Sequence, residues 1–234
     1  QMQRPVESLT SSVLAYILGS NPRLEELNLS GADVELNVIV ALSRTMLSCR
    51  TQLKHLDISG IGFCPQGAMA IARVLTVNNT MKYLNMQNNA IGDDGAIAMA
   101  NALQVNSSLT YLNVAANEIK VEGSLALLQA LKVNRTLHCF DMSKNYATDV
   151  GAYAISDTLR SNKVLESLCI GELEIEEDGS KAIACSLNTN NTLKELRFDG
   201  NEIGNDAAKV LSEALKTNTA LTWLDIDENG IPLE

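Results

Sequence analysis

The sequence predicts an α/β solenoid, an open horseshoe with a parallel β-sheet on its concave face and α-helices on its convex face. Three observations support this fold. One apolar pattern recurs every 28 residues along the chain. Each copy alternates like a short strand and is then followed by a helical stripe. The second face of every predicted strand is polar, so that face of the sheet meets water.

The repeat has apolar residues at its first, fourth and sixth places, as in Leu53, Leu56 and Ile58. The copies that keep an unbroken 28-residue spacing begin at Leu53, Met81, Leu109, Leu137, Leu165, Leu193 and Leu221. A further copy begins at Leu24, one residue out of step. Units of this kind bury their apolar faces only against one another, so a fixed period in this range indicates stacked coils.

Each unit begins with a predicted strand and a turn. Apolar fourth and sixth places alternate with polar third, fifth and seventh places, which is the period of a strand buried on one face. The ninth place is often asparagine, whose amide both donates and accepts backbone hydrogen bonds where the chain leaves the strand. These residues are Asn89, Asn117, Asn145, Asn201 and Asn229. The other three units carry Ala32, Ile61 and Leu173 instead.

Each unit continues as a predicted amphipathic helix. Small or apolar residues recur at helical spacing, for example from Gly95 to Leu103, and form one stripe that packs on the strands. Residues 8–20 fit the helical half of a preceding unit. We expect an asparagine to end most helices: Asn21, Asn78, Asn106, Asn134, Asn162, Asn190 and Asn218.

A closed barrel of alternating strands and helices is the main rival fold. Its strands are buried on both faces. In this chain the second face stays polar, as at Asn85, Gln87 and Asn113. The sequence therefore favours the open horseshoe, whose curvature follows from helices being wider than strands.

The pattern LxxLxLxxNxIxxxG, followed by an amphipathic helix, resembles the ribonuclease-inhibitor class of leucine-rich repeats, and the resemblance covers essentially the whole chain. Similar repeats occur in ribonuclease inhibitor, in RanGAP, in the sensor regions of NOD-like receptors and in CARMIL-type scaffold proteins. The resemblance implies the fold strongly and the function only weakly.

We interpret residues 1–234 as a single repeat domain. It comprises a partial helical unit (1–23), repeats starting at 24, 53, 81, 109, 137, 165 and 193, and a truncated repeat (221–234). Because the chain starts within a predicted helix and stops just after a predicted strand, we expect it to be a fragment of a longer protein.

Composition excludes several classes of protein. Lys and Arg number 18 against 28 Asp and Glu, for a net charge of −10, which disfavours binding to nucleic acid. No uncharged apolar run approaches the ~18 residues of a membrane-spanning helix. Five cysteines without a CxxC spacing indicate reduced thiols, and hence the cytoplasm or the nucleus.

The search for chemistry finds no catalytic, cofactor or metal site. Phosphate-binding glycine motifs are missing. His55, Asp57 and Ser59 alternate on one predicted strand, and a spacing of roughly 6.5–7 Å is too long for a catalytic triad. Cys139 and Cys169 lie diagonally on neighbouring strands, which suits neither a disulfide nor a metal. We interpret the remaining cysteines, at positions 49, 64 and 185, as small apolar filler.

The predicted concave face is strongly acidic. Its acids are Glu26, Asp57, Asp141, Glu172, Glu195, Asp199, Asp225, Asp227 and Glu228, and its bases are Lys144 and Arg197. Nine acids minus two bases give −7 of the total charge of −10. A concave acidic surface attracts a basic protein or peptide. Solubility is the alternative explanation, because charges also protect open sheets from aggregation.

Aromatic residues add candidate anchors on the same face. Tyr83, Tyr111 and Trp223 occupy the exposed third place, and the two tyrosines are expected to stack on adjacent strands. Cross-strand packing alone is the alternative role for these rings. The predicted partner-binding residues are Tyr83, Tyr111, Asp141, Glu195, Arg197, Asp199, Trp223, Asp225 and Asp227.

The acidic segment from Gly171 to Asp178 has two interpretations: a solvated turn that deviates from its neighbours, or a partner-contact loop. For the whole chain, the sequence favours a non-catalytic protein–protein interaction scaffold. A RanGAP-like GTPase-activating protein and the ligand-sensing repeats of a NOD-like receptor are the alternatives.

Overall fold

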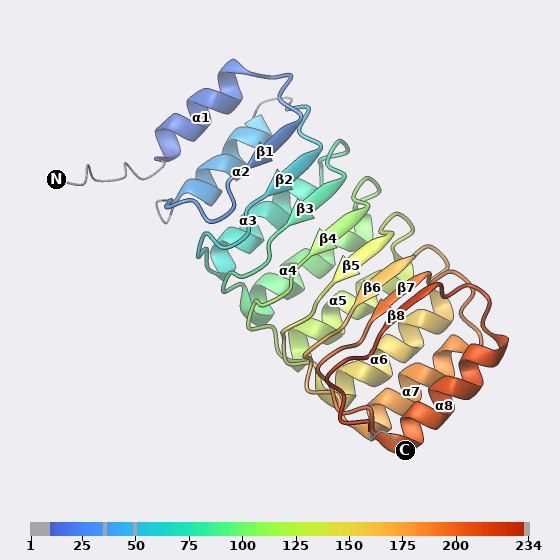
Figure 1. Ribbon diagram of the computed structural model, residues 1–234. Helices are drawn as coiled ribbons and strands as arrows, with labels where there is room; N and C mark the ends of the chain where they lie inside the picture. The colour runs from blue at the N-terminus through green and yellow to red at the C-terminus, as the bar shows by residue number, and fades with distance from the viewer. Residues whose placement is uncertain (1–9, 35–36, 49–50, 232–234) are drawn as a thin grey trace, which may run out of the picture.

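The computed structural model describes residues 10–34, 37–48 and 51–231. In this part of the chain one open sheet of eight strands runs along the molecule, and its strands lie in sequence order. All neighbouring strands are parallel (Figure 1). An open sheet in sequence order confirms the solenoid and excludes the barrel.

The strands are β1 (Glu26–Asn28), β2 (His55–Asp57), β3 (Tyr83–Asn85), β4 (Tyr111–Asn113), β5 (Cys139–Asp141), β6 (Ser167–Cys169), β7 (Glu195–Arg197) and β8 (Trp223–Asp225). The helices are α1 (Ser11–Ser20), α2 (Val38–Ser48), α3 (Pro65–Leu75), α4 (Gly92–Val105), α5 (Val121–Val133), α6 (Thr148–Ser161), α7 (Glu177–Leu187) and α8 (Gly204–Thr217).

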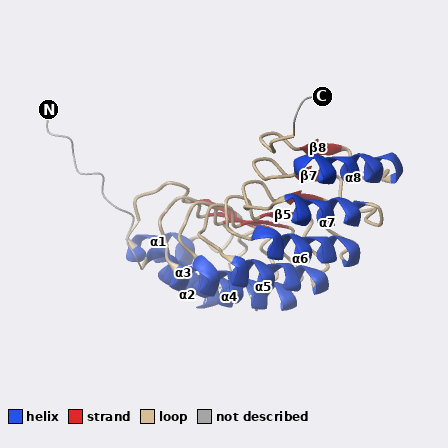
Figure 2. Cartoon of the chain, turned by 90° about the horizontal axis from the view of Figure 1, so that it is seen from below, coloured by secondary structure: helices blue, strands red, loops and turns tan. Residues whose placement is uncertain are grey.

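The helices form the outer layer of an arc, and the strands line its inner side (Figure 2). Among the described helices, none has both the length and the apolar character that crossing a membrane requires. Helix α1 follows an N-cap at Thr10, so the first residues of the helix predicted for 8–20 lie outside the described residues.

The strand register follows the repeat. Leu56 pairs with Leu84, and Leu84 pairs with Leu112, so equivalent places of successive units lie side by side. The first unit has one extra residue, which lies between β1 and β2, and the register is kept because Glu26 pairs with His55. Side chains at the third and fifth places therefore form continuous rows across the concave face.

The core lies between the sheet and the helices. The central strand residues Leu84 and Leu112 are completely buried, and so are Met99 and Leu103 of α4. Small residues let neighbouring helices approach closely. A Cβ atom at Gly95 would lie only 2.9 Å from the Cβ of Ala68 on α3, so glycine is required at this contact.

The ninth-place asparagines link neighbouring coils as predicted. Asn145 is buried, and its Oδ1 accepts hydrogen bonds from the N–H groups of Asn117 and Ile119, both at 3.0 Å. Its Nδ2 donates to the carbonyl oxygens of Met142 at 2.8 Å and Val114 at 3.1 Å. One amide thus satisfies backbone groups of two successive turns.

The acidic segment from Gly171 to Asp178 keeps the same course, although Leu173 replaces the asparagine. Leu173 is fully buried, and its N–H donates to Asn201 Oδ1 at 3.0 Å, as does the N–H of Ile175 at 3.2 Å. The expectation of a local deviation is therefore wrong. The asparagine of the following unit holds this turn, and Leu173 adds to the core.

Two asparagines do not end helices as predicted. Helix α3 ends at Leu75, before Asn78, and α7 ends at Leu187, before Asn190. Asn78 instead shapes the next turn, because its Oδ1 accepts from the N–H of Met81 at 2.8 Å. The residues that do cap helix C-termini as predicted are Asn21, Asn106, Asn134, Asn162 and Asn218.

Candidate partner-binding surface

Two rows of side chains define the concave face. The third-place row runs from β1 to β8 through Glu26, His55, Tyr83, Tyr111, Cys139, Ser167, Glu195 and Trp223. The fifth-place row runs in parallel through Asn28, Asp57, Asn85, Asn113, Asp141, Cys169, Arg197 and Asp225. Of the predicted binding residues, only Asp199 and Asp227 lie outside these rows, on the turns after β7 and β8.

Aromatic rings stack along the third-place row. The Tyr83 and Tyr111 rings lie 4.3 Å apart between centroids at an interplanar angle of 11°, which confirms the predicted stack. His55 extends it, with its ring 5.7 Å from Tyr83 at 17°. Burial raises the pKa of Tyr111 to about 12 against an opposing hydrogen bond with Asn113. Tyr111 is therefore neutral at physiological pH.

His55, Asp57 and Ser59 do not form a triad. The prediction that side chains two places apart here are too distant to hydrogen-bond is wrong for Asp57 and Ser59. The Ser59 hydroxyl donates to Asp57 Oδ1 at 2.6 Å, because the strand ends at Asp57 and the chain turns back. Asp57 also accepts from the Ser59 N–H at 3.0 Å and from Asn85 Nδ2 at 3.1 Å. Asp57 thus organises the turn, while the His55 ring packs on Tyr83.

Both bases of the concave face are engaged within the protein. Lys144 Nζ lies 3.0 Å from Glu172 Oε1. Arg197 Nε lies 3.8 Å from Asp225 Oδ2 and 3.9 Å from Asp199 Oδ1. The remaining acids of this face have no Lys or Arg partner within the described residues: Glu26, Asp57, Asp141, Glu195, Asp227 and Glu228. The face therefore presents net negative charge to any partner.

Trp223 lies at the C-terminal end of the third-place row. Its side chain is 45% exposed, as expected for a surface anchor. The Arg197 guanidinium lies over this ring, with its central carbon 5.7 Å from the ring centroid. The cation covers part of one face of the indole and leaves the rest of the side chain open to solvent.

The cysteines are free thiols in different environments. Cys139 and Cys169 are half-buried on the concave face, and burial raises the pKa of Cys169 to about 12 and also raises the pKa of Cys139. Cys185 is exposed on α7 and Cys64 is partly exposed, so the interpretation as apolar filler is wrong for Cys185, whose place faces outward. Cys49 lies outside the described residues. Within the described chain, no cluster of potential metal ligands occurs.

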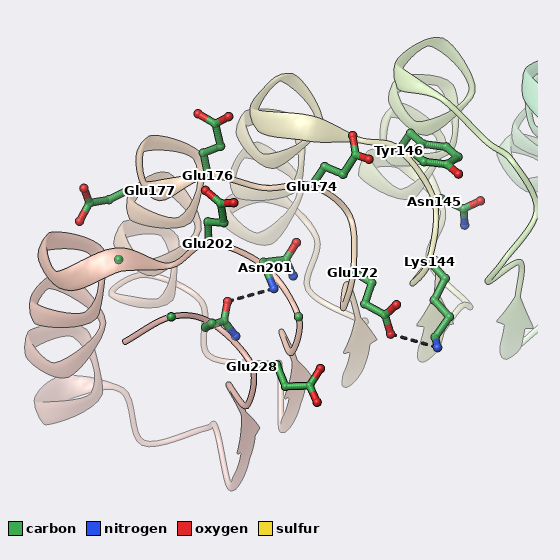
Figure 3. A pocket seen from close by; sticks show the side chains of 14 residues that line it. Lys144, Asn145, Tyr146, Glu172, Glu174, Glu176, Glu177, Asn201, Glu202 and Glu228 are labelled. Atoms are coloured by element: carbon green, nitrogen blue, oxygen red, sulfur yellow. Dashed lines mark hydrogen bonds and ion pairs between the residues drawn. The ribbon is translucent and has the colours of Figure 1, made fainter. Parts of the chain in front are cut away.

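A pocket lies on the rim beside the last repeats (Figure 3). Its lining includes Glu174, Glu176, Glu202 and the ring of Tyr146, which is 46% exposed. Glu174 and Glu176 belong to the acidic segment from Gly171 to Asp178, whereas Tyr146 and Glu202 were not predicted, because they follow the strands and lie beyond the eighth place. The sequence does contain a signal for this rim. The tenth place of four consecutive units is occupied by Glu118, Tyr146, Glu174 and Glu202. The acidic surface therefore continues from the concave face onto this rim.

The family model described as "Leucine Rich repeat" matches residues 77–100, 105–128 and 189–212. These segments fall on the repeat units that the strands and asparagine bonds define. The chain therefore contains leucine-rich repeats, and its solenoid of alternating parallel strands and helices is similar to the ribonuclease-inhibitor-like class. Comparison with curated protein sequences gave no match.

Solved structures similar to this leucine-rich repeat protein include actin-binding site 2 of leiomodin-1. The two are 28% identical with a TM-score of 0.52, over 60% of this chain and 79% of that chain. The C-terminal domain of Caenorhabditis elegans tropomodulin is 16% identical with a TM-score of 0.50, over 76% of this chain and 92% of that chain. At 16% identity the tropomodulin likeness shows the shared fold alone.

Proposed function

We propose that this leucine-rich repeat protein is a non-catalytic scaffold that binds a basic segment of a partner protein on its concave face. The single observation that carries the proposal is the charge of this face. Its acids outnumber its bases by nine to two, and both bases are already paired with acids of the same face. Such a surface favours a cationic partner and accelerates encounter at low ionic strength.

The contact residues in this proposal are those that the sequence indicated. Tyr83, Tyr111 and Trp223 provide rigid apolar area, and Asp141 and Glu195 provide charge. Asp199, Asp225 and Asp227 extend the negative surface at the C-terminal end, with Arg197 holding two of them in place. The free thiols among the described cysteines fit a reducing compartment, so we place the interaction in the cytoplasm or the nucleus.

Binding of a fluorescent lysine-rich peptide, measured by anisotropy at two salt concentrations, tests this proposal. We expect binding that weakens as salt rises. We also expect weaker binding after Tyr111→Ala, Trp223→Ala or Asp225→Asn. Asp94→Asn on the exposed side of α4 is a matched control with the same change of charge. If the three concave variants all bind like the wild type, the proposal is wrong.

A second candidate partner is actin. It is favoured by the likeness to leiomodin-1 actin-binding site 2, at 28% identity over 60% of this chain. Co-sedimentation with filamentous actin, and gel filtration with monomeric actin, test it directly. Loss of binding in Trp223→Ala would place actin on the concave face. Failure to bind either form of actin would remove this candidate and leave the scaffold proposal intact.

Two alternatives stay open from the sequence. A RanGAP-like activity predicts faster single-turnover GTP hydrolysis by Ran when this protein is added, and an unchanged rate excludes it. A role as the sensor of a NOD-like receptor predicts a nucleotide-binding domain in the same gene product.

A further inference from the structure

Beside the aromatic stack, the third-place row has two short side chains between two longer ones, and we call this stretch the notch. Tyr111 forms one wall, Cys139 and Ser167 form the floor, and Glu195 stands at the opposite wall. Neighbouring strands are ~4.8 Å apart, so three strand steps separate Tyr111 and Glu195 by roughly 14 Å. The two floor side chains are far shorter than a tyrosine. The row therefore steps down between its two larger flanks.

The wall formed by Tyr111 presents an aromatic face. Tyr83 covers one face of the Tyr111 ring, with the two rings nearly parallel at 11°. The other face is consequently turned toward β5, where the short side chain of Cys139 follows in the row. The face of an aromatic ring is electronegative and attracts a cation that packs against it.

Two carboxylates border the notch. Asp141 lies in the fifth-place row next to Cys139 on the same strand, and one of its oxygens, Oδ1, accepts from the Ser143 N–H at 3.0 Å. Glu195 is exposed and stands at the far wall. Burial raises the pKa of Cys139 most, and the negative charges of Glu195 and Glu166 raise it further. Glu166 is already paired with Lys194 at 2.8 Å.

The acids that stay uncompensated at the notch are therefore Asp141 and Glu195. Neither has a Lys or Arg partner within the described residues. A ligand that fits must carry positive charge to meet these carboxylates and a flat surface to pack against Tyr111. A guanidinium group has both properties, together with a weaker hydration shell than an ammonium group.

We propose that this notch binds a single arginine side chain of the partner, with its guanidinium against the open face of Tyr111 and within reach of Asp141 and Glu195. The inference rests on the proposed function, because it gives the basic partner a defined anchor on the concave face. It adds a preference for arginine over lysine, which an acidic surface alone does not impose.

The test uses two probes: a short lysine-rich peptide with one central arginine, and the same peptide with lysine at that position. Affinities are measured by anisotropy, and the Tyr111 ring resonances are followed by NMR. We expect the arginine peptide to bind roughly 3- to 10-fold more tightly and to shift the Tyr111 resonances. Cys139→Leu fills the notch and should abolish this preference, so that the two peptides bind with equal affinity.

Ser167→Leu fills the floor from the neighbouring strand and serves as a second variant if Cys139→Leu folds poorly. Asp141→Asn and Asp227→Asn form a matched pair, because they change charge equally and only the first borders the notch. Equal affinity of the two peptides for the wild type would overturn the arginine site. Salt-dependent binding of both peptides would still support the scaffold. If neither peptide binds at low salt, the proposed function and the arginine site are both wrong.

Discussion

The central guanidinium carbon of Arg197 lies 5.7 Å from the centroid of the Trp223 ring on the neighbouring strand. The same guanidinium lies within ion-pair distance of Asp199 and Asp225. Arg197 therefore organises the C-terminal end of the concave face from within and neutralises part of its charge.

Replacing Arg197 by Met should strengthen binding of a cationic peptide. The change leaves Asp199 and Asp225 without their cation, and we expect a roughly 2- to 5-fold gain in affinity. The emission of Trp223, the only tryptophan, should also change as its cation is lost. Lys209→Met on the exposed face of α8 is the control, and an equal gain there would show that only net charge matters.

Asn145→Ala should destabilise the fold substantially. The buried amide bonds backbone groups of two coils, and their loss leaves several of these groups unsatisfied in the core. We expect a loss of about 2–4 kcal/mol in the free energy of unfolding, measured by chemical denaturation. Gln129→Ala on the exposed side of α5 should change it by less than ~0.5 kcal/mol. Similar values for both variants would contradict the role of the asparagine ladder.

Ala116→Gly should stabilise the protein. Ala116 has a φ of 52°, a left-handed conformation that costs a residue with a Cβ atom roughly 1 kcal/mol. Glycine removes this strain. Part of the resulting gain in stability is lost, because glycine has greater conformational freedom in the unfolded chain. We expect a net gain of about 0.5 kcal/mol. Ala126→Gly within α5 should instead cost about 0.5–1 kcal/mol, and the two variants should therefore move the denaturation midpoint in opposite directions.

Alkaline pH should destabilise the fold before the buried groups themselves ionise. The pKa of Tyr111 rises from 10.0 to about 12, and that of Cys169 from 9.0 to about 12, mainly through burial. The unfolded chain therefore releases these protons first. Their contribution to stability is full below pH ~9 and is lost progressively as pH rises toward ~12. Denaturation midpoints should fall across this pH range. Tyr111→Phe should reduce the part of this fall that comes from ionisation of the Tyr111 phenol.

Thiol reactivity should separate the cysteines of the described chain. Cys185 is exposed, whereas Cys169 stays protonated because of its raised pKa. We expect iodoacetamide at mildly alkaline pH to modify Cys185 much faster than Cys169, because the thiolate is the reactive form. Peptide mapping by mass spectrometry measures both rates. Comparable rates in the folded protein, equal to those in denaturant, would contradict the burial of Cys169.

The sequence by itself determined the solenoid, the strand positions and the two rows of the concave face. A 28-residue period leaves one register in which every unit buries its leucines, and this register places Tyr83 beside Tyr111. The ninth-place asparagines were predictable for the same reason, because each must serve backbone groups at the same turn of every coil.

The tertiary structure alone decided the features that depend on side-chain direction and local turn geometry. The pairing of Arg197, the hydrogen bond from Ser59 to Asp57 and the exposure of Cys185 belong to this group. A repeat period specifies which residues are neighbours. It does not specify how far a chain turns after its strand, or which of several neighbouring carboxylates a flexible cation reaches, because those outcomes depend on small energy differences between nearby conformations.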